Sequence, residues 1–268
     1  MIDICIAEIT SFLPESFSEE TLFVRGCREI DSVRLAKVEA CKSGENKARS
    51  LCCGLMLQYY LRRHLGVEKK VEILYGYGES GKPYLKEYSD IHFNLSHSGR
   101  YAAAVFADRE VGIDIQTVRS VREGLASRIL SPEEHARYGQ LVLPEERTEW
   151  FFRCWCAKES YGKLTGEGMA ADFRRVTYLP EQRCILFAGA CEKNGNAPGE
   201  IGKNMAVAGN AEKETPVWEA ACMAYVPAPG YNMNVCTART GTEKEILFPE
   251  EVRDVTKELQ ELCGGAGQ

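Results

Sequence analysis

The stretch VGIDIQ, residues 111–116, determines how the fold of this chain is interpreted. Its apolar residues alternate with the others, which predicts a β-strand with one apolar face. Asp114 and Gln116 share the opposite face of that strand. Two interpretations remain open for this polar pair. It marks either the end of an edge strand facing water, or oxygen ligands for a hard cation such as Mg²⁺.

A second informative stretch is RTEWFFRCWCAKESYGKLTG, residues 147–166, which has the apolar spacing of a long α-helix. At about 100° per residue, an apolar stripe that includes Phe151 and Cys156 continues into Glu159, and Lys163 lies close to it. Such a stripe normally faces the protein interior. A carboxylate in that position therefore needs a cation or a metal as a partner.

Glu159 and Lys163 have a simpler interpretation as an i,i+4 ion pair on a solvated surface. Their place on the face expected to be buried favours a functional role instead. Lys158 lies roughly a quarter turn from the centre of the stripe, so we expect it to reach solvent. Asp114 and Glu159 together would supply two oxygen ligands from separate elements.

Two polar loops carry further candidates. In NLSHSGR, Ser96 and His97 suggest a hydrolase, but no GxSxG nucleophile elbow surrounds the serine. His97 is either a phosphate donor or a structural histidine. In GKPYL, Lys82 is followed by the rigid Pro83, which alone is a weak signal.

Composition excludes several classes of protein. The chain has 268 residues, 44% hydrophobic and 27% charged, which is ordinary for a globular protein with one large or two small domains. A net charge of −6 argues against a bulk nucleic-acid binder. No apolar run reaches the roughly 18 residues of a membrane span, and the first residues lack a secretory signal, so we expect a cytoplasmic protein. The 12 cysteines show no CxxC pair and are expected to be reduced thiols in the core.

The remaining pattern predicts an α/β (α+β) protein. A strand at the start is followed by helix over about residues 30–65 with Gly66 as a C-cap, and Ser131-Pro132 begins another helix. Four strands close the chain, and a Gly- and Asn-rich insertion, expected to be mobile, lies at about 191–216. No repeat is visible in the sequence.

Taken together, GKPY, FNLSHSGRYAAAVF, VGIDIQ and WFFRCWCAKESYGKLTGEG resemble the 4′-phosphopantetheinyl transferase superfamily, surfactin type (Sfp-type), in order and spacing. PGYNMNVCTA resembles the closing strand of that family. The resemblance covers roughly residues 1–240 apart from the insertion. It implies two similar pseudo-twofold lobes, each a small antiparallel sheet packed on a long helix. We place these lobes at 1–112 and 113–268.

The resemblance also implies an activity. Coenzyme A would bind between the lobes, and its phosphopantetheine arm would move to a serine of an apo acyl or peptidyl carrier protein with Mg²⁺, releasing adenosine 3′,5′-bisphosphate. Such carriers serve fatty acid, polyketide or nonribosomal peptide synthesis. The enzyme would be a monomer without nucleic-acid or membrane partners.

By position, Asp114 and Glu159 match the family's Mg²⁺ ligands, and Gln116 stands where many relatives have glutamate. Glutamine is a weaker donor to a hard cation, so a water fills this place in one interpretation. Glu159 and Lys163 would be catalytic, as general base and as neutraliser of the pyrophosphate. The residues matched to contacts with coenzyme A are Arg34, Lys37, Arg49, Lys82, Pro83, Ser96, His97 and Lys163.

Other functions stay open at this level. A transferase of primary metabolism, specific for one carrier protein, is usually a chain about half this long that trimerises. A non-catalytic module that binds coenzyme A or a carrier protein would explain Gln116 as a sign of decay, but not the presence of Asp114, Glu159 and Lys163. A cysteine-based redox or zinc protein would contain stoichiometric metal.

Overall fold

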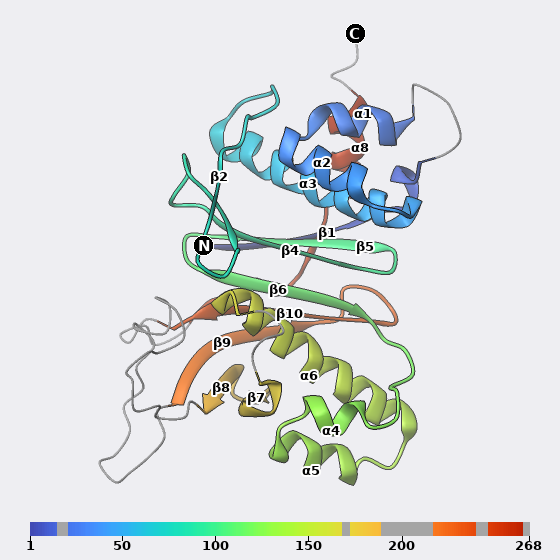
Figure 1. Cartoon of the computed structure of the whole chain (residues 1–268), viewed down its shortest axis with the longest axis vertical. Coiled ribbons are helices and arrows are strands. Elements are labelled where there is room, and N and C mark those ends of the chain that lie inside the picture. Colours follow the sequence, from blue (N-terminus) through green and yellow to red (C-terminus); the bar gives the residue numbers. More distant parts are fainter. Residues whose placement is uncertain (15–20, 168–171, 189–216, 240–245, 265–268) are drawn as a thin grey trace.

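The computed structural model describes residues 1–14, 21–167, 172–188, 217–239 and 246–264. The insertion predicted at about 191–216 lies outside the described residues. The described elements form two halves, each with helices on the outside and sheet toward the middle of the molecule (Figure 1). None of the described helices combines the length and apolar character of a membrane span.

The N-terminal half begins with a strand and continues through helices to a hairpin. Its elements are β1 (Ile2–Glu8), η1 (Thr10–Phe12), α1 (Leu22–Glu29), α2 (Ser32–Ala40), α3 (Gly44–Leu65), β2 (Tyr75–Tyr77), β3 (Pro83–Leu85), β4 (His92–Ser98) and β5 (Tyr101–Ala107). The helix predicted over 30–65 is therefore α2 and α3, separated by a short break. The side chains of Asp31 and Ser43 cap these two helices by accepting hydrogen bonds from Arg34 N and Asn46 N. Gly66 ends α3 with φ of 65°, as predicted.

The C-terminal half follows the same plan. Its elements are β6 (Val111–Thr117), α4 (Leu125–Ile129), α5 (Pro132–Gln140), α6 (Pro144–Thr165), η3 (Phe173–Arg175), β7 (Val176–Leu179), β8 (Cys184–Ala188), β9 (Val217–Tyr225) and β10 (Tyr231–Ala238). The start predicted for α5 is confirmed, with Ser131 in a capping box and Pro132 in the first turn.

The topology contains the repeat that the sequence does not show. In the N-terminal sheet, β1 pairs antiparallel with β5, and β5 pairs with β4. In the C-terminal sheet, β6 pairs antiparallel with β10, and β10 pairs with β9. Each half also contains one helix of 22 residues, α3 or α6. The predicted α+β architecture of two pseudo-twofold lobes is thus confirmed.

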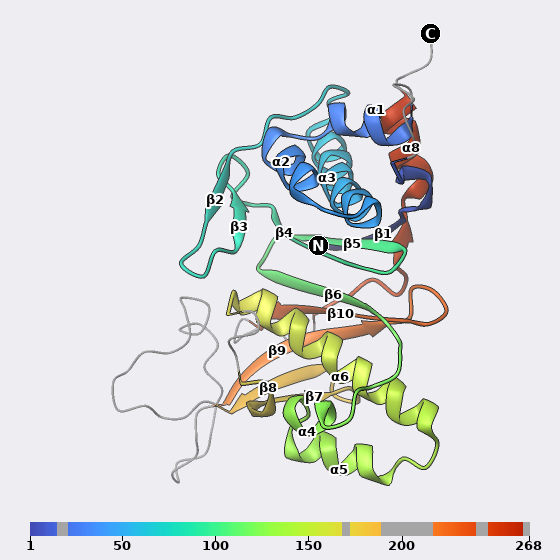
Figure 2. The same cartoon turned by 45° about the vertical axis from the view of Figure 1, so that its right-hand side comes forward.

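The end of the chain returns to the first half. The strand β11 (Arg253–Asp254) pairs parallel with β1, and α8 (Thr256–Gly264) follows it. In Figures 1 and 2, α8 lies beside α1. The buried side chains of Val255 and Leu259 belong to the same core as α3. This segment, which falls within the predicted lobe 113–268, thus packs with the N-terminal half, and the predicted boundary between residues 112 and 113 falls within β6.

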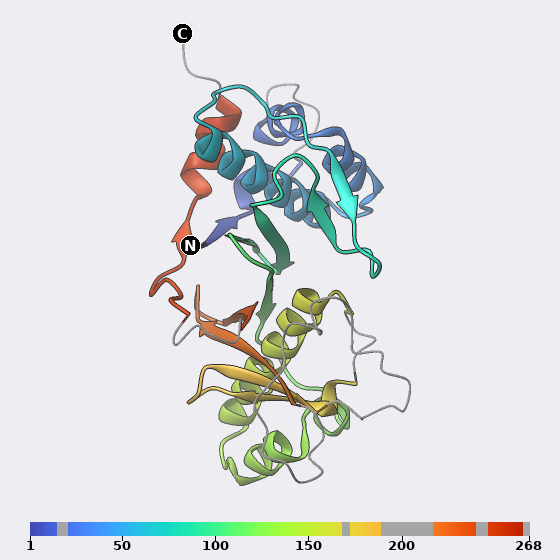
Figure 3. The ribbon, with the colours of Figure 1, turned by 90° about the vertical axis from the view of Figure 1, so that its left-hand side faces the viewer.

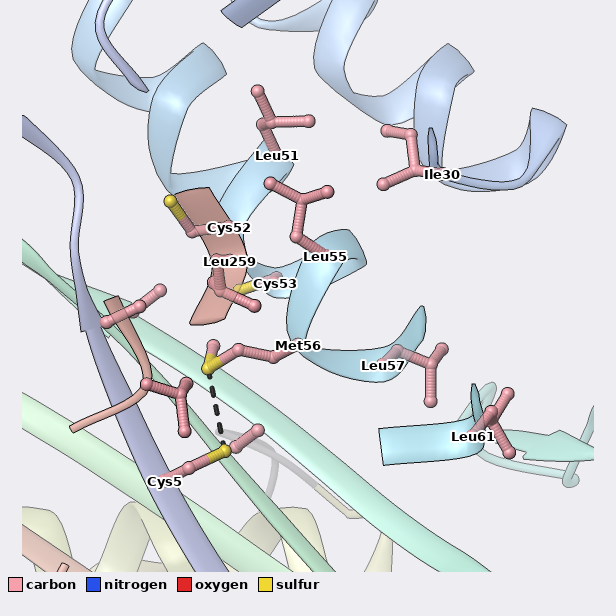
Figure 4. Packing of buried hydrophobic residues seen from close by; sticks show 14 of the residues in the cluster. Cys5, Ile30, Leu51, Cys52, Cys53, Leu55, Met56, Leu57, Leu61 and Leu259 are labelled. Carbon is pink, nitrogen blue, oxygen red and sulfur yellow. Dashed lines mark hydrogen bonds between the residues drawn. The ribbon is translucent and has the colours of Figure 1, made fainter. Parts of the chain in front are cut away.

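Among the residues that the structure describes, three hydrophobic cores stabilise the molecule, one in each half and one between them. Figure 4 shows the core of the N-terminal half, where Leu55 and Met56 of α3 pack with Leu259 and Cys5 donates to the Met56 sulfur at 3.7 Å. A second core surrounds α6. The third lies between the sheets and contains apolar residues of β1, β5, β6 and β10. Every cysteine among the described residues is a free thiol, and most are buried, as predicted.

Candidate functional site

The strand β6 forms the boundary between the two halves (Figure 3). Ile113 and Ile115, both fully buried, belong to the core between the sheets. The side chains at alternate positions project from the other face, on which α6 packs: Asp114 there bonds Lys163 of that helix. This arrangement explains why one strand carries an apolar face and a polar face. The strand has two different partners, an apolar core on one face and a polar helix surface on the other.

Gly112 allows α6 to lie unusually close to β6. A Cβ atom at this position would stand 2.6 Å from the backbone nitrogen of Leu164 and closer still to the carbonyl oxygen of Ser160. Neither backbone atom can move without moving the helix. The glycine therefore sets the distance between strand and helix, and with it the distance between the polar side chains that the two elements carry.

Asp114 is the centre of the polar contacts. It is only 3% exposed, and both of its carboxylate oxygens have partners. Oδ1 accepts from Lys163 Nζ at 2.7 Å and from Ser96 Oγ at 2.9 Å, while Oδ2 accepts from Gln116 Nε2 at 3.0 Å. A buried carboxylate is stabilised by such partners, because burial without them is costly. Gln116 thus directs its amide nitrogen at Asp114.

Lys163 is paired with Asp114 and not with Glu159. Its ammonium donates to Asp114, to Ser96 Oγ at 2.9 Å and to the carbonyl oxygen of Ile113 at 3.0 Å. These contacts use all three of its N–H donors. The surface i,i+4 ion pair that the sequence allowed is absent among the described residues. A contact between Lys163 and a phosphate would require exchange of one of these partners.

Glu159 is half-buried and has no hydrogen bond or ion pair with any described residue. Burial raises the pKa of its carboxyl, the charge of Asp114 raises it further, and Lys163 lowers it. The carboxylates of Asp114 and Glu159 thus lie within electrostatic range of each other, and the Lys163 ammonium acts on both. Within the described part of the chain, no cluster of three His, Cys, Asp or Glu side chains with metal-binding geometry occurs.

The predicted cations gather around strand β4. Burial raises the pKa of the Cys53 thiol to about 11, and the charges of Arg34, Lys163 and Lys37 oppose this shift. These three cations come from α2 and α6. All three charges therefore act on the same thiol, which donates to the carbonyl oxygen of Ser96 in β4 at 3.9 Å, and their contact with a phosphate stays a prediction. The buried Arg34 side chain lies over the Tyr75 ring and leaves its Nε without a hydrogen-bond partner.

Arg49 and His97 lie at the same end of the site. Arg49 donates to the carbonyl oxygen of Gly99 at 2.6 Å, which fixes it to the β4–β5 turn. Desolvation lowers the pKa of His97, and the charges of Arg49 and Lys163 lower it further. The imidazole is therefore neutral at pH 7 and retains one N–H donor.

Lys82 has a clamping role in this structure. Its ammonium contacts the Glu110 carboxylate and donates to the carbonyl oxygens of Val111 at 3.0 Å and Leu164 at 3.1 Å. It thereby ties the β2–β3 hairpin to β6 and to the end of α6. A cavity of about 430 Å³, lined by Lys82 and Pro83 among others, adjoins this clamp. Contact with a phosphate would require Lys82 to release one of its three partners.

Lys158 is placed differently from the sequence prediction. It is fully buried and pairs with the Glu134 carboxylate at 2.8 Å, and it donates to the carbonyl oxygen of Phe173 at 2.6 Å and to that of Val176. The sequence does contain a signal for this burial, because Lys158 lies seven residues after the buried Phe151 and shares its face. The helix is buried on more than one side, so the single-stripe analysis failed here.

Sequence reasoning also missed a buried polar residue beside Asp114. Asn234 lies directly opposite Asp114 in the β6–β10 register and is fully buried. Its Oδ1 accepts from Ser160 Oγ at 3.0 Å, while its Nδ2 has no partner. The alternation of YNMNVC was the available signal, since it places the asparagines on the face of Asp114.

Comparisons with known proteins show which families this chain is similar to. A model of the 4′-phosphopantetheinyl transferase superfamily matches residues 110–194, which include β6 and α6. A 4′-phosphopantetheinyl transferase of Bacillus subtilis is 31% identical over 146 residues, 53% of this chain and 64% of that protein. The 4′-phosphopantetheinyl transferase Sfp of Bacillus subtilis (strain 168) is 27% identical over 216 residues, 80% of this chain and 82% of that protein.

Among solved structures, Thermotoga maritima holo-[acyl-carrier-protein] synthase (AcpS) matches with a TM-score of 0.31 at 20% identity. That match covers 48% of this chain and 64% of the other chain.

Proposed function

We propose that this chain, which is similar to 4′-phosphopantetheinyl transferases, is a member of that superfamily: it transfers the 4′-phosphopantetheine arm of coenzyme A to a serine of an apo acyl or peptidyl carrier protein and releases adenosine 3′,5′-bisphosphate. One observation carries the proposal. The buried Asp114 of β6 and Lys163 of α6 are in contact at 2.7 Å, and Glu159 lies within their electrostatic range.

The donor set fits a hard divalent cation. Asp114 and Glu159 offer carboxylate oxygens from two elements, and burial, together with the charge of Asp114, raises the pKa of Glu159. We assign both as ligands of Mg²⁺. When bound, Mg²⁺ would offset negative charge on the pyrophosphate group of coenzyme A. Gln116 directs its Nε2 at Asp114, so its role as a third ligand stays doubtful and a water is the alternative.

The cations would hold the phosphates of coenzyme A. Lys163 would neutralise charge at the pyrophosphate, and His97 would donate its remaining N–H to a phosphate oxygen. Arg34, Lys37 and Arg49 would bind the 3′-phosphate end. These cations come from three different helices, so only the folded chain presents them to one ligand.

The carrier serine must lose its proton as it attacks the phosphorus atom. Glu159 is the proposed acceptor of that proton, because its carboxyl has a raised pKa and no competing hydrogen bond among the described residues. Tight metal coordination would weaken a carboxylate as a base, so the two proposed roles of Glu159 oppose each other. The remaining chemistry requires positioning and charge neutralisation more than covalent catalysis.

We further propose a cytoplasmic monomer that does not act on nucleic acid or membranes. One chain already supplies both pseudo-twofold halves, so no second subunit is needed to complete the fold. A non-catalytic module that binds coenzyme A or a carrier protein is the second candidate. It does not account for the Asp114–Lys163 pair beside an unpaired Glu159.

The test is a transfer reaction with the full chain, coenzyme A, Mg²⁺ and an apo carrier protein. Intact mass spectrometry should show addition of one phosphopantetheine group, abolished by chelator and restored by added Mg²⁺. Binding of coenzyme A without any transfer to acyl and peptidyl carriers would support the non-catalytic alternative.

A further inference from the structure

Strands β4 and β6 are joined by side chains and not by a backbone ladder. The backbone nitrogen of Ile113 donates to Asn94 Oδ1 at 3.1 Å, and that of Ile115 donates to Ser96 Oγ at 3.3 Å. The backbone nitrogen of Thr117 donates to Ser98 Oγ at 3.0 Å. We call Asn94, Ser96 and Ser98 the side-chain ladder. Its members alternate along β4, so all three face β6 and connect the two halves of the molecule.

Ser96 is the member of this ladder that also contacts the candidate site. Its hydroxyl donates to Asp114 Oδ1 at 2.9 Å and accepts from Lys163 Nζ at 2.9 Å, besides accepting from the backbone of Ile115. Among the described residues, the Ser98 hydroxyl bonds only Thr117, through its backbone nitrogen and its Oγ1 at 3.2 Å. Both serines therefore join β4 to β6, but only Ser96 also bonds Asp114 and Lys163 of the candidate site.

The contacts of Ser96 also limit what else it can bind. A hydroxyl has one donor and two acceptor lone pairs. Asp114 takes the donor, while Ile115 and Lys163 take the two acceptor positions. The side chain is only 6% exposed. No capacity is left for a phosphate oxygen, which is the contact that family resemblance implied for Ser96.

We propose that Ser96 is a positioning residue, not a ligand of coenzyme A: it holds Asp114 and Lys163 in register with the N-terminal half across the side-chain ladder. This inference rests on the proposed function, because it concerns the same site. Its physical basis is that a hydrogen bond to a carboxylate fixes the orientation of its oxygens, and such partners of metal ligands strongly affect metal affinity.

The test compares Ser96→Ala with Ser98→Ala in the full chain, since each removes one rung of the side-chain ladder. Mn²⁺ binding is followed by electron paramagnetic resonance in the presence of coenzyme A and without carrier protein. We expect Ser96→Ala to weaken Mn²⁺ binding by about 10- to 100-fold. Ser98→Ala should leave it unchanged. Both variants should lower the melting temperature, and Ser96→Ala should do so more because it also removes hydrogen bonds to the buried Asp114 and to Lys163.

Kinetics separate positioning from binding of coenzyme A. Ser96→Ala should lower kcat while the KM for coenzyme A stays unchanged, and Ser96→Thr, which retains the hydroxyl, should restore Mn²⁺ affinity. Should the alanine variant not fold, Ser96→Cys retains the volume with a weaker donor and is compared in the same way.

Two results would overturn the inference. One is Mn²⁺ affinity of Ser96→Ala equal to that of Ser98→Ala. The other is a raised KM for coenzyme A with unchanged Mn²⁺ affinity, which would make Ser96 a phosphate ligand. A wild type that binds Mn²⁺ in a Ser96-dependent way but transfers nothing would overturn the proposed function and leave this inference standing. A wild type that binds no Mn²⁺ would overturn both.

Discussion

Replacing Gly112 with alanine tests whether the spacing between β6 and α6 sets the site. The added Cβ would lie 2.6 Å from Leu164 N, where ordinary contacts begin at 3.4 Å. Relieving this one contact requires the helix to move by roughly 0.8 Å, and the closer contact with Ser160 O requires more. A shift of that size along the Asp114–Lys163 bond would lengthen it from 2.7 Å to beyond the usual hydrogen-bond range.

Two magnitudes follow from this displacement. Overpacking of a buried contact costs about 2 kcal/mol, which lowers the melting temperature by roughly 4–8 °C in a chain of this size. Displacement of reacting groups by about 1 Å costs on the order of 100-fold in rate. Gly112→Ala should therefore lose far more activity than its loss of stability explains.

The assay is transfer to an apo carrier protein at a temperature at which the variant is fully folded, beside thermal unfolding by circular dichroism. Gly139→Ala is the matched control, because a Cβ at this position of α5 meets nothing within 4 Å. The control should be as active as the wild type and more stable by about 0.5–1 kcal/mol. Wild-type activity of folded Gly112→Ala would refute the reasoning.

Four further predictions concern single carboxylates and Gln116. Glu159→Ala should abolish transfer while the circular dichroism spectrum stays native; wild-type turnover would remove its assignment as base and ligand. Burial raises the pKa of Glu159, so folding disfavours its charged form. Glu159→Gln should therefore raise the melting temperature at pH 7, and this increase should shrink as pH falls through the raised pKa. An increase that does not change with pH would contradict this reasoning. Burial raises the pKa of Glu110, but His92 and Lys82 lower it more, so that it falls to about 2. The stability it contributes, about 2 kcal/mol after allowance for solvent screening, should be complete above pH 4.5 and disappear as pH falls toward 2, as measured by urea unfolding of wild type and Glu110→Gln. Gln116→Glu should tighten Mg²⁺ binding measured by calorimetry, and an unchanged affinity would place position 116 outside the ligand shell.

Local signals in the sequence determined much of the secondary structure. Alternating apolar residues predicted β6, and the spacing over 147–166 predicted α6. Ser131 with Pro132 predicted the start of α5, and Gly66 the end of α3. Caps and periodicity act within one or two turns of the chain, so they can be recognised without knowledge of the fold. The polar face of VGIDIQ can also be recognised locally, since alternation alone places Asp114 on the face opposite its apolar neighbours.

The partners of Lys158 on α6 could not be derived in this way. A single apolar stripe placed Lys158 near solvent, but α5, η3 and β7 cover that side of the helix and supply its partners. A buried ammonium is acceptable only because Glu134 and backbone carbonyls surround it. These partners lie up to 24 residues away, and no local pattern announces them.

The sequence by itself therefore determined which residues carry charge and which face of their element each one occupies. Only the tertiary structure decided their pairing: Lys163 with Asp114 instead of Glu159, Lys82 with Glu110, and Ser96 with both Asp114 and Lys163. The physical reason is range. Periodicity is set by bonds along the chain, whereas an ion pair depends on atoms brought within about 3 Å by the packing of elements that are distant in sequence.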